Sequence, residues 1–457
     1  MAYRFPSLVA ACAAILAFPA AAQSLSVPYV MDTLPNGLRL IVHEDHSVPI
    51  VAVNLRFLVG SSDERPGRTG FAHLYEHLMF MGSEHAIYPA FDRMLEAAGA
   101  DNNGATWEYG TMYTEDGPAT ALPLMMWLDS DRMGWFLPTM DSAKVDLQRD
   151  VVKNERRQSV ENQPYGLASE TVLRLLYPPS NPYSWPVIGS MADLSAASLA
   201  DVKEFFRIYY APNNAVLVVA GDVQADSVRR AVRYWFGEIP RGPAITRPNP
   251  AAVTLARDTS AVLEDKVQLA RVYDVWPTVR AFSPDEPSLE LTAYLLTGAK
   301  NSRLTKPMVY QDEIASEVYA WQNAKPLAGD FYIVATARPD TSLTVLQGAI
   351  QAQLARLAAD GPTARELAQA KNAIEAAFLE RLEGLSGFGG KAASLNSYYY
   401  LTGDPDYFAQ DLARYQAVSA TDIQRVVRTY LLKPKVVVSV VPEGRRALAA
   451  TAAGATP

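Results

Sequence analysis

The stretch SLADVKEFFRIYYAPNNAVLVVAGD, Ser198 to Asp222, predicts an amphipathic helix that leads into a valine-rich strand. Its opening Ser-x-x-Asp is typical of a capping box at a helix N-terminus. The same pattern returns 221 positions later in SATDIQRVVRTYLLKPKVVVSVVPE, Ser419 to Glu443. Helix-then-strand endings are common in α+β proteins, but several matches at one spacing favour a duplicated domain.

We therefore predict an α+β fold with two homologous domains, each an antiparallel or mixed β-sheet packed with helices. Proline, glycine and arginine interrupt the pattern at residues 239–252, which we interpret as the interdomain linker. The N-terminal domain is expected over residues 23–238 and the C-terminal domain over residues 253–444. Residues 445–457 are expected to be a disordered tail.

Two further features bear on this organisation. Residues 38–60 predict two strands joined by a polar turn, which together would form an early hairpin. The second half of the chain contains no histidine. A metal site that uses imidazole ligands is therefore expected in the N-terminal domain.

Residues 1–22 have the composition of a secretory signal. An early Arg4 precedes an apolar run and three alanines, so cleavage is expected near Ala22 and Gln23. The protein is then secreted, and a bacterial periplasm is the expected compartment. Cys12, the only cysteine, lies within this segment, and the short apolar run before it disfavours a lipoprotein site there. The mature chain would have no disulfides and no thiolate ligands.

The overall charge excludes one class of partner. Charged residues make up 20% of the chain and the formal net charge is -8. This mild acidity provides no basic surface for nucleic acid. No segment after the signal is long and apolar enough to predict a transmembrane helix.

The sequence HLYEH, His73 to His77, carries the chemistry. Histidines four positions apart on a helix project from one face, so both imidazoles reach one zinc ion at about 2.0–2.1 Å. Glu76 lies on the same side, placed to take a proton from a water molecule that the metal activates. The surrounding apolar residues predict a buried helix, on which these polar groups would be costly without a cation.

A catalytic zinc site needs a third protein ligand, and with cysteine absent a carboxylate is expected. The residues alone leave seven candidates open: Glu96, Glu108, Glu115, Asp150, Glu155, Glu161 and Glu170. Glu155 has one local argument. Val151 and Val152, one turn earlier, place it on a half-buried helical face.

His-x-x-Glu-His reverses the zincin motif and is the signature of the inverzincins. Together with LEAAGADNNGATWEYGTMYTE, LDSDRMG and QRDVVKNERRQSVENQPYG, the motif resembles the pitrilysin/insulysin family. The two-domain bacterial branch, similar to mitochondrial processing peptidase subunits, fits best. The resemblance covers about Val27 to Glu443, and the order and spacing of the motifs are specific.

The resemblance implies His73, His77 and Glu155 as ligands of one Zn²⁺ per chain and Glu76 as the catalytic base. Glu155 follows the second histidine by 78 positions. The resemblance also implies that the two domains enclose a chamber. Substrate main chain would add as a strand to an edge that includes Asn103, Ala105 and Thr106.

This sequence departs from the family pattern in two places. Seven positions before Glu155, where relatives carry a second glutamate, it has Gln148, so the electrostatic support of the metal site is expected to be weaker. Active relatives also carry an Arg and a Tyr seven residues apart in the second domain, which contact the peptide. One register places Val309 and Ser316 at those positions, whereas another restores the pair as Arg303 and Tyr310.

The predicted function is that of a secreted zinc metallopeptidase that hydrolyses oligopeptides or unfolded segments. A dimer is expected. If the Arg/Tyr pair is missing, the chain would be the zinc-bearing half of a heterodimer with a related zinc-less chain. The alternative is a non-catalytic assembly or peptide-binding subunit of the same fold.

Overall fold

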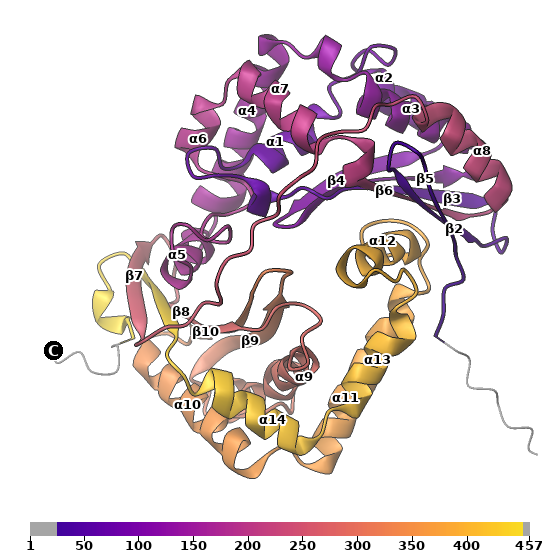
Figure 1. Ribbon diagram of the computed structural model, residues 1–457. Coiled ribbons are helices and arrows are strands. Elements are labelled where there is room, and N and C mark those ends of the chain that lie inside the picture. Colours follow the sequence, from indigo (N-terminus) through magenta and orange to yellow (C-terminus); the bar gives the residue numbers. More distant parts are fainter. Residues whose placement is uncertain (1–24, 451–457) are drawn as a thin grey trace, which may run out of the picture.

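The computed structural model describes residues 25–450, so the predicted signal, residues 1–22, lies outside the described part of the chain. Two separate β-sheets, each packed with helices, form the two halves of the molecule (Figure 1). The strands of the first sheet are β1 Val30–Thr33, β2 Arg39–Glu44, β3 Ile50–Phe57, β4 Asp101–Trp107, β5 Gly110–Pro118 and β6 Ala215–Gly221. Those of the second are β7 Thr259–Asp265, β8 Arg271–Thr278, β9 Ala315–Ala324, β10 Gly329–Ala337 and β11 Val436–Pro442.

The first sheet has the order β1-β2-β6-β3-β5-β4. Every residue of β6 is buried, and this strand runs parallel to β2 and antiparallel to β3. The hairpin predicted for residues 38–60 is therefore wrong: β2 and β3 both form, but β6 lies between them. An apolar strand buries both of its faces only in the middle of a sheet, and that burial outweighs the local closure of a short turn.

The second sheet repeats this topology in the order β7-β11-β8-β10-β9. Here β11 takes the place of β6, parallel to β7 and antiparallel to β8. Its first residue, Val436, follows Ala215 at the start of β6 by 221 positions. Capping boxes are present at both Ser198 and Ser419. The predicted α+β fold of two homologous domains, each a mixed sheet packed with helices, is confirmed.

The helices of the first domain are α1 Phe71–Leu78, α2 Ala90–Ala97, α3 Leu122–Gly134, α4 Ser142–Arg156, α5 Leu167–Leu176, α6 Met191–Ala196, α7 Leu199–Tyr209 and α8 Ala225–Phe236. Those of the second are α9 Glu286–Thr297, α10 Leu343–Asp360, α11 Ala364–Arg381, α12 Lys391–Thr402, α13 Phe408–Ala417 and α14 Ala420–Val426. Helices α1, α3 and α8 lie against one face of the first sheet, over a core that includes Leu40, Leu55 and Leu74. None of the described helices combines the length and the apolarity that a membrane span needs.

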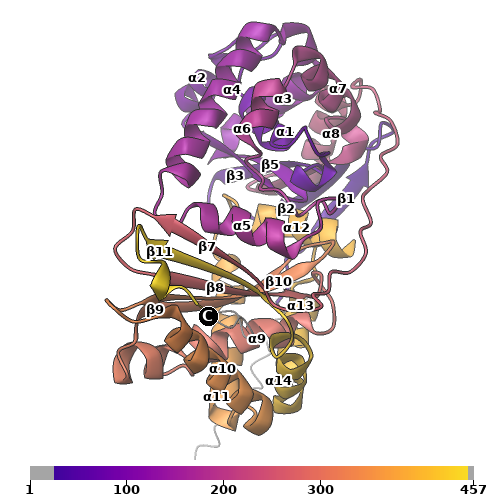
Figure 2. The ribbon, with the colours of Figure 1, turned by 90° about the vertical axis from the view of Figure 1, so that its left-hand side faces the viewer.

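The opposite face of each sheet is covered by a helix from the other domain. Helix α12 lies on β6 and β3 of the first sheet, where Leu395 is fully buried. Helix α5 lies on β8 and β11 of the second sheet, where Val172 is fully buried. Figures 1 and 2 show both helices between the two sheets. This reciprocal exchange of apolar surface holds the domains together.

The interdomain linker and the C-terminal tail differ in how much regular structure they contain. No helix or strand is assigned from residue 237 to residue 258, a stretch that includes the predicted linker. The tail predicted to be disordered over residues 445–457 instead begins with ordered structure, because Arg446–Leu448 form a 3-10 helix and Ala450 is 8% exposed. An ion pair from Arg446 to Glu264 at 3.2 Å anchors it. Residues 451–457 lie outside the described chain.

Buried polar contacts accompany α12 at the interface. The Asn396 side-chain amide donates to the Asn54 side-chain oxygen on β3 at 2.8 Å, and both residues are fully buried. The buried Arg56 guanidinium donates to Ser397 Oγ at 3.2 Å and lies 4.7 Å from the ring centre of Tyr400. Because each contact joins the two domains, the contacts fix how α12 sits on the first sheet.

Replacing Asn396 tests this interface. Asn396→Ala leaves the buried oxygen of Asn54 without its donor, which costs about 1–3 kcal/mol. We expect the free energy of unfolding, measured by urea denaturation, to fall by that amount. Gln410→Ala, at an exposed position of α13, is the control and should change it by less than about 0.5 kcal/mol. Equal effects of the two substitutions would contradict the assigned role of Asn396.

Candidate metal centre

Helix α1 carries the predicted ligands, and its start is held from outside the helix. Gly70 takes the N-cap position at a φ of 86°, in the left-handed region that favours glycine, and has no side chain to cap the helix. The Glu64 carboxylate provides the cap: it accepts from the N–H groups of Gly70 at 2.9 Å and Ala72 at 2.8 Å. Burial raises the pKa of Glu64 well above its usual range. Sequence analysis missed this residue because a cap six positions upstream follows no local motif.

His73 and His77 project from α1 towards Glu155 near the end of α4. The Nε2 atoms of His73 and His77 lie 3.7 Å and 3.3 Å from one oxygen atom, Oε2 of Glu155. The two imidazole ring centres are 4.9 Å apart. The structure thus brings the three predicted ligands together at one point.

This arrangement fits zinc. Ligand atoms about 2.0–2.1 Å from a tetrahedral ion lie roughly 3.4 Å from one another, close to the 3.3 Å and 3.7 Å found here. Two imidazoles and one carboxylate form a donor set that suits zinc, with a fourth position left for a water molecule. Burial lowers the pKa of His73 to about 4, so this imidazole is neutral and available as a ligand at pH 7.

Glu76 lies beside the ligands. Its carboxylate and the imidazoles of His73 and His77 have ligand atoms within 4.8 Å of one another. Thr106 Oγ1 on β4 donates to Glu76 Oε2 at 2.6 Å. Thr106 therefore fixes the Glu76 carboxylate, whereas one oxygen of Glu155 lies within 3.7 Å of both imidazoles.

Strand β4 approaches α1 closely at Gly104. A Cβ atom at this position would lie 2.9 Å from Glu76 Cγ, so a side chain there would displace the carboxylate. The three residues predicted to bind substrate, Asn103, Ala105 and Thr106, all lie on β4. Since β4 is the last strand of its sheet, the described structure has no strand on its outer side. Sequence analysis missed Gly104 because its importance depends on helix packing.

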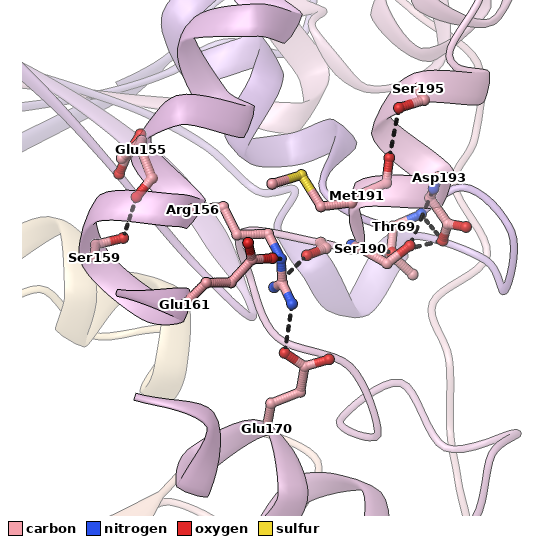
Figure 3. A network of polar contacts seen from close by, with 11 residues as sticks. Thr69, Glu155, Arg156, Ser159, Glu161, Glu170, Ser190, Met191, Asp193 and Ser195 are labelled. Carbon is pink, nitrogen blue, oxygen red and sulfur yellow. Dashed lines mark hydrogen bonds and ion pairs between the residues drawn. The ribbon is translucent and has the colours of Figure 1, made fainter. Parts of the chain in front are cut away.

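A buried arginine holds the part of α4 that presents Glu155. At this point α4 passes into a π-helical turn of residues 157–161, a conformation that is frequent at functional sites. The Arg156 guanidinium donates to Glu161 at 3.1 Å, to Glu170 at 2.7 Å and to a backbone oxygen at 2.9 Å (Figure 3). This network fixes the end of α4, and therefore the backbone from which Glu155 extends.

The same contacts separate Glu155 from the other carboxylates that sequence analysis left open. Five of them have basic partners elsewhere: Glu161 and Glu170 at Arg156, Glu115 at Arg132, Glu108 at Lys325, and Asp150 at Lys153. The sixth, Glu96, is exposed on α2. Glu155 is the candidate that contacts both histidines.

Gln148 and Asn103, two further residues that the sequence placed at the site, have local partners. The Gln148 side-chain amide on α4 donates to Met81 Sδ, just beyond α1, at 2.8 Å. It therefore ties α4 to the end of the ligand helix. The Asn103 side-chain oxygen accepts from the Gly104 N–H at 2.8 Å, within β4 itself.

The second domain contains both sets of candidate positions for the Arg/Tyr pair. Arg303 forms a bidentate ion pair with Glu366, from Nε at 2.9 Å and Nη2 at 2.8 Å, and Tyr310 is 54% exposed. In the other register, Val309 packs on the second core and Ser316 Oγ donates to a backbone carbonyl at 3.2 Å. The Arg303 guanidinium is therefore bound to Glu366 within its own domain.

Two protein-family models match the chain, and one of them covers the residues of this site. The model of "Insulinase (Peptidase family M16)" matches residues 39–178, and that of "Peptidase M16 inactive domain" matches residues 196–374. The zinc protease PqqE of Helicobacter pylori is 28% identical over 420 residues, 90% of this chain and 91% of that protein. The probable mitochondrial-processing peptidase subunit beta of Arabidopsis thaliana is 24% identical over 436 residues, 91% of this chain and 79% of that protein. A crystal structure of a protease from Helicobacter pylori has a TM-score of 0.84 and 25% identity, covering 91% of this chain and 100% of that one.

Two homologous α+β domains, with an inverted His-x-x-Glu-His helix in the first, define a class of zinc metallopeptidases. The chain belongs to the insulinase family, peptidase family M16. The predicted likeness to pitrilysin, insulysin and the mitochondrial processing peptidases is thereby confirmed.

The Arg303–Glu366 pair predicts a pH-dependent stability. Pairing with Arg303 lowers the pKa of Glu366 to about 2 from its ordinary value of 4.5. The stabilisation is therefore complete above about pH 4.5 and is lost as the pH falls towards 2. Arg303→Met should be less stable than the wild type at pH 7, and the difference should shrink between about pH 4.5 and 2. Urea denaturation across this range measures the difference.

Arg365→Met, at an exposed neighbouring position on α11, is the control and should show no such trend. A difference between Arg303→Met and the wild type that stays constant at every pH would contradict the assigned pairing.

Proposed function

We propose that this protein is a secreted zinc endopeptidase that cleaves oligopeptides or unfolded segments, with one Zn²⁺ per chain. One observation carries the proposal: His73, His77 and Glu155 converge beside Glu76 at the open edge of a β-sheet. An extended peptide can add as a strand at such an edge, which brings its backbone to the metal.

The residues of the site divide the chemistry between them. His73, His77 and Glu155 would hold the metal. Zinc, when bound, supplies a Lewis acid that polarises the peptide carbonyl and lowers the pKa of water. Glu76, held in place by Thr106 Oγ1 at 2.6 Å, takes a proton from the attacking water and passes it to the leaving amine nitrogen.

Substrate binding would rely on main-chain hydrogen bonds. The outer edge of β4 offers backbone N–H and C=O groups along Asp101–Trp107, with Asn103 and Ala105 beside the cleaved bond. Backbone pairing is insensitive to side-chain identity, so it contributes affinity, and the side-chain contacts provide any sequence preference. In this proposal the two domains enclose the bound peptide in a chamber.

The proposed partner and the proposed compartment rest on two separate observations. Arg303 is bound to Glu366 and the alternative register has Val309 and Ser316, so a related zinc-less chain would supply the missing Arg and Tyr in a heterodimer. The signal-like residues 1–22 support secretion to a bacterial periplasm.

Glu76→Gln tests the proposed function. The amide keeps the size of the side chain but cannot accept the proton, so hydrolysis of a quenched fluorescent peptide should fall by about 10²–10⁴-fold. Zinc content, measured on the same sample, should stay at one ion per chain. The assay is run with and without a related zinc-less chain. Glu96→Gln, exposed on α2, is the matched control and should leave both unchanged.

The opposite result identifies the alternative. A zinc-free wild type that behaves like Glu76→Gln in every assay would favour a non-catalytic assembly or peptide-binding subunit.

Gly104→Ala tests the close contact between β4 and α1. The added methyl would displace Glu76 by steric contact, and none of its three nearest atoms belongs to His73, His77 or Glu155. Because a misplacement of about 1 Å costs about 10²-fold in rate, we expect a loss of kcat of that order with zinc retained. Gly348→Ala on α10, where a Cβ would meet open space, should have no effect. Full activity of Gly104→Ala would show that the contact is dispensable.

A further inference from the structure

Strand β4 presents two different faces beside the metal centre. Gly104 and Thr106 face α1, because both contact Glu76. Side chains alternate along a strand, so Ala105 and Trp107 face the other way, towards the second domain. The proposed function uses only the first of these faces.

A loop of the second domain, residues 383–390 between α11 and α12, crosses this other face. Leu385 packs against Gly221 at the end of β6. The next residue, Ser386, lies near Asp116 on β5, where burial raises the pKa of the Asp116 carboxyl and the Ser386 side chain acts to lower it. The loop therefore runs over the sheet from its centre towards the open edge.

Phe388 ends this crossing at β4. Its ring centre lies 5.7 Å from that of Trp107 with the ring planes at 80°, an edge-to-face contact between the two domains. Both aromatic residues remain partly exposed. On either side of Phe388, a Cβ on Gly387 or Gly389 would have no atom within 4 Å, so the loop has open space at both of these positions. Ala105, two positions before Trp107, is too small to cover the remaining aromatic surface.

We propose that Trp107 and Phe388 form a specificity subsite for one large apolar side chain of the bound peptide. The inference rests on the proposed function, in which a peptide adds to β4 as a strand. The side chains of such a peptide alternate, and those that point away from the metal pass Ala105 and Trp107. A leucine or phenylalanine there is removed from water against two aromatic rings, which a charged side chain does not favour.

The subsite has two consequences for the enzyme. Its substrates are peptides with a large apolar residue close to the cleaved bond, on the side of the peptide opposite to the metal. The subsite is complete only when the two domains are packed together, because each domain contributes one ring. Selection of this side chain is therefore linked to the interface that α12 makes with the first sheet.

A peptide series tests the subsite. Quenched fluorescent peptides differ only at one position, scanned along the peptide, where phenylalanine or leucine replaces serine or glutamate. The wild type should prefer the apolar peptide at one position by about tenfold or more in kcat/KM. Trp107→Ala and Phe388→Ala should each lower this ratio several-fold, with zinc content unchanged. Trp107→Phe and Phe388→Leu should retain most of it.

Trp321→Ala is the matched control. Trp321 lies on β9 of the second sheet, 40% exposed and stacked on Tyr332, so its loss should leave the ratio unchanged. The same ratio in the wild type and in both alanine variants would overturn the proposal.

A binding measurement separates this proposal from the proposed function. Anisotropy with the same peptides, labelled, reports their affinity for zinc-loaded Glu76→Gln. An apolar preference that disappears when Trp107→Ala is added supports the subsite, even if the wild type hydrolyses none of the peptides. Equal affinities for the apolar and polar peptides overturn the subsite and leave the zinc-dependent hydrolysis to be judged by Glu76→Gln alone.

Discussion

The costly burial of polar groups on helix α1 is the constraint on which the rest of the site depends. Two imidazoles and a carboxylate share a helix whose Leu74 and Leu78 are fully buried, and such groups need partners or a cation. Thr106 Oγ1 donates to the Glu76 carboxylate and so meets part of this need, and Glu64 caps the start of the helix. The network around Arg156 fixes the part of α4 that brings Glu155 to the histidines.

Helices α5 and α12 join the two domains into one structure. Each sheet depends on a helix of the other domain to cover one of its faces. The surroundings of the open edge of β4 therefore include residues of both domains. The loop before α12 places Phe388 against Trp107 on that edge. The second domain, which lacks the proposed metal ligands, therefore contributes to the surface on which a peptide would lie.

Local patterns predicted much of this architecture. The spacing of His73 and His77 needed only the geometry of a helix, and the Ser-x-x-Asp boxes needed only the first turn. Contacts between segments far apart in the sequence were harder to predict from local patterns. The early strands β2 and β3 were recognised, but not their separation by β6, because pairing depends on a strand roughly 170 residues away in sequence, as Ala215 follows Glu44. The residues alone left seven carboxylates open as the third ligand, with one local argument for Glu155, and the tertiary structure places Glu155 beside both histidines.

The sequence by itself determined the repeat of a helix and a strand, the family, and the pair of imidazoles with Glu76 between them. These features follow from residues within one or two turns of each other, for which covalent geometry leaves few arrangements. Tertiary structure alone decided the need for glycine at position 104 and the meeting of Trp107 with Phe388, and it placed Glu155, which the family resemblance had implied, beside both histidines. Each of these depends on the distance between elements far apart in the chain, and that distance is set by how the apolar faces of the two domains pack.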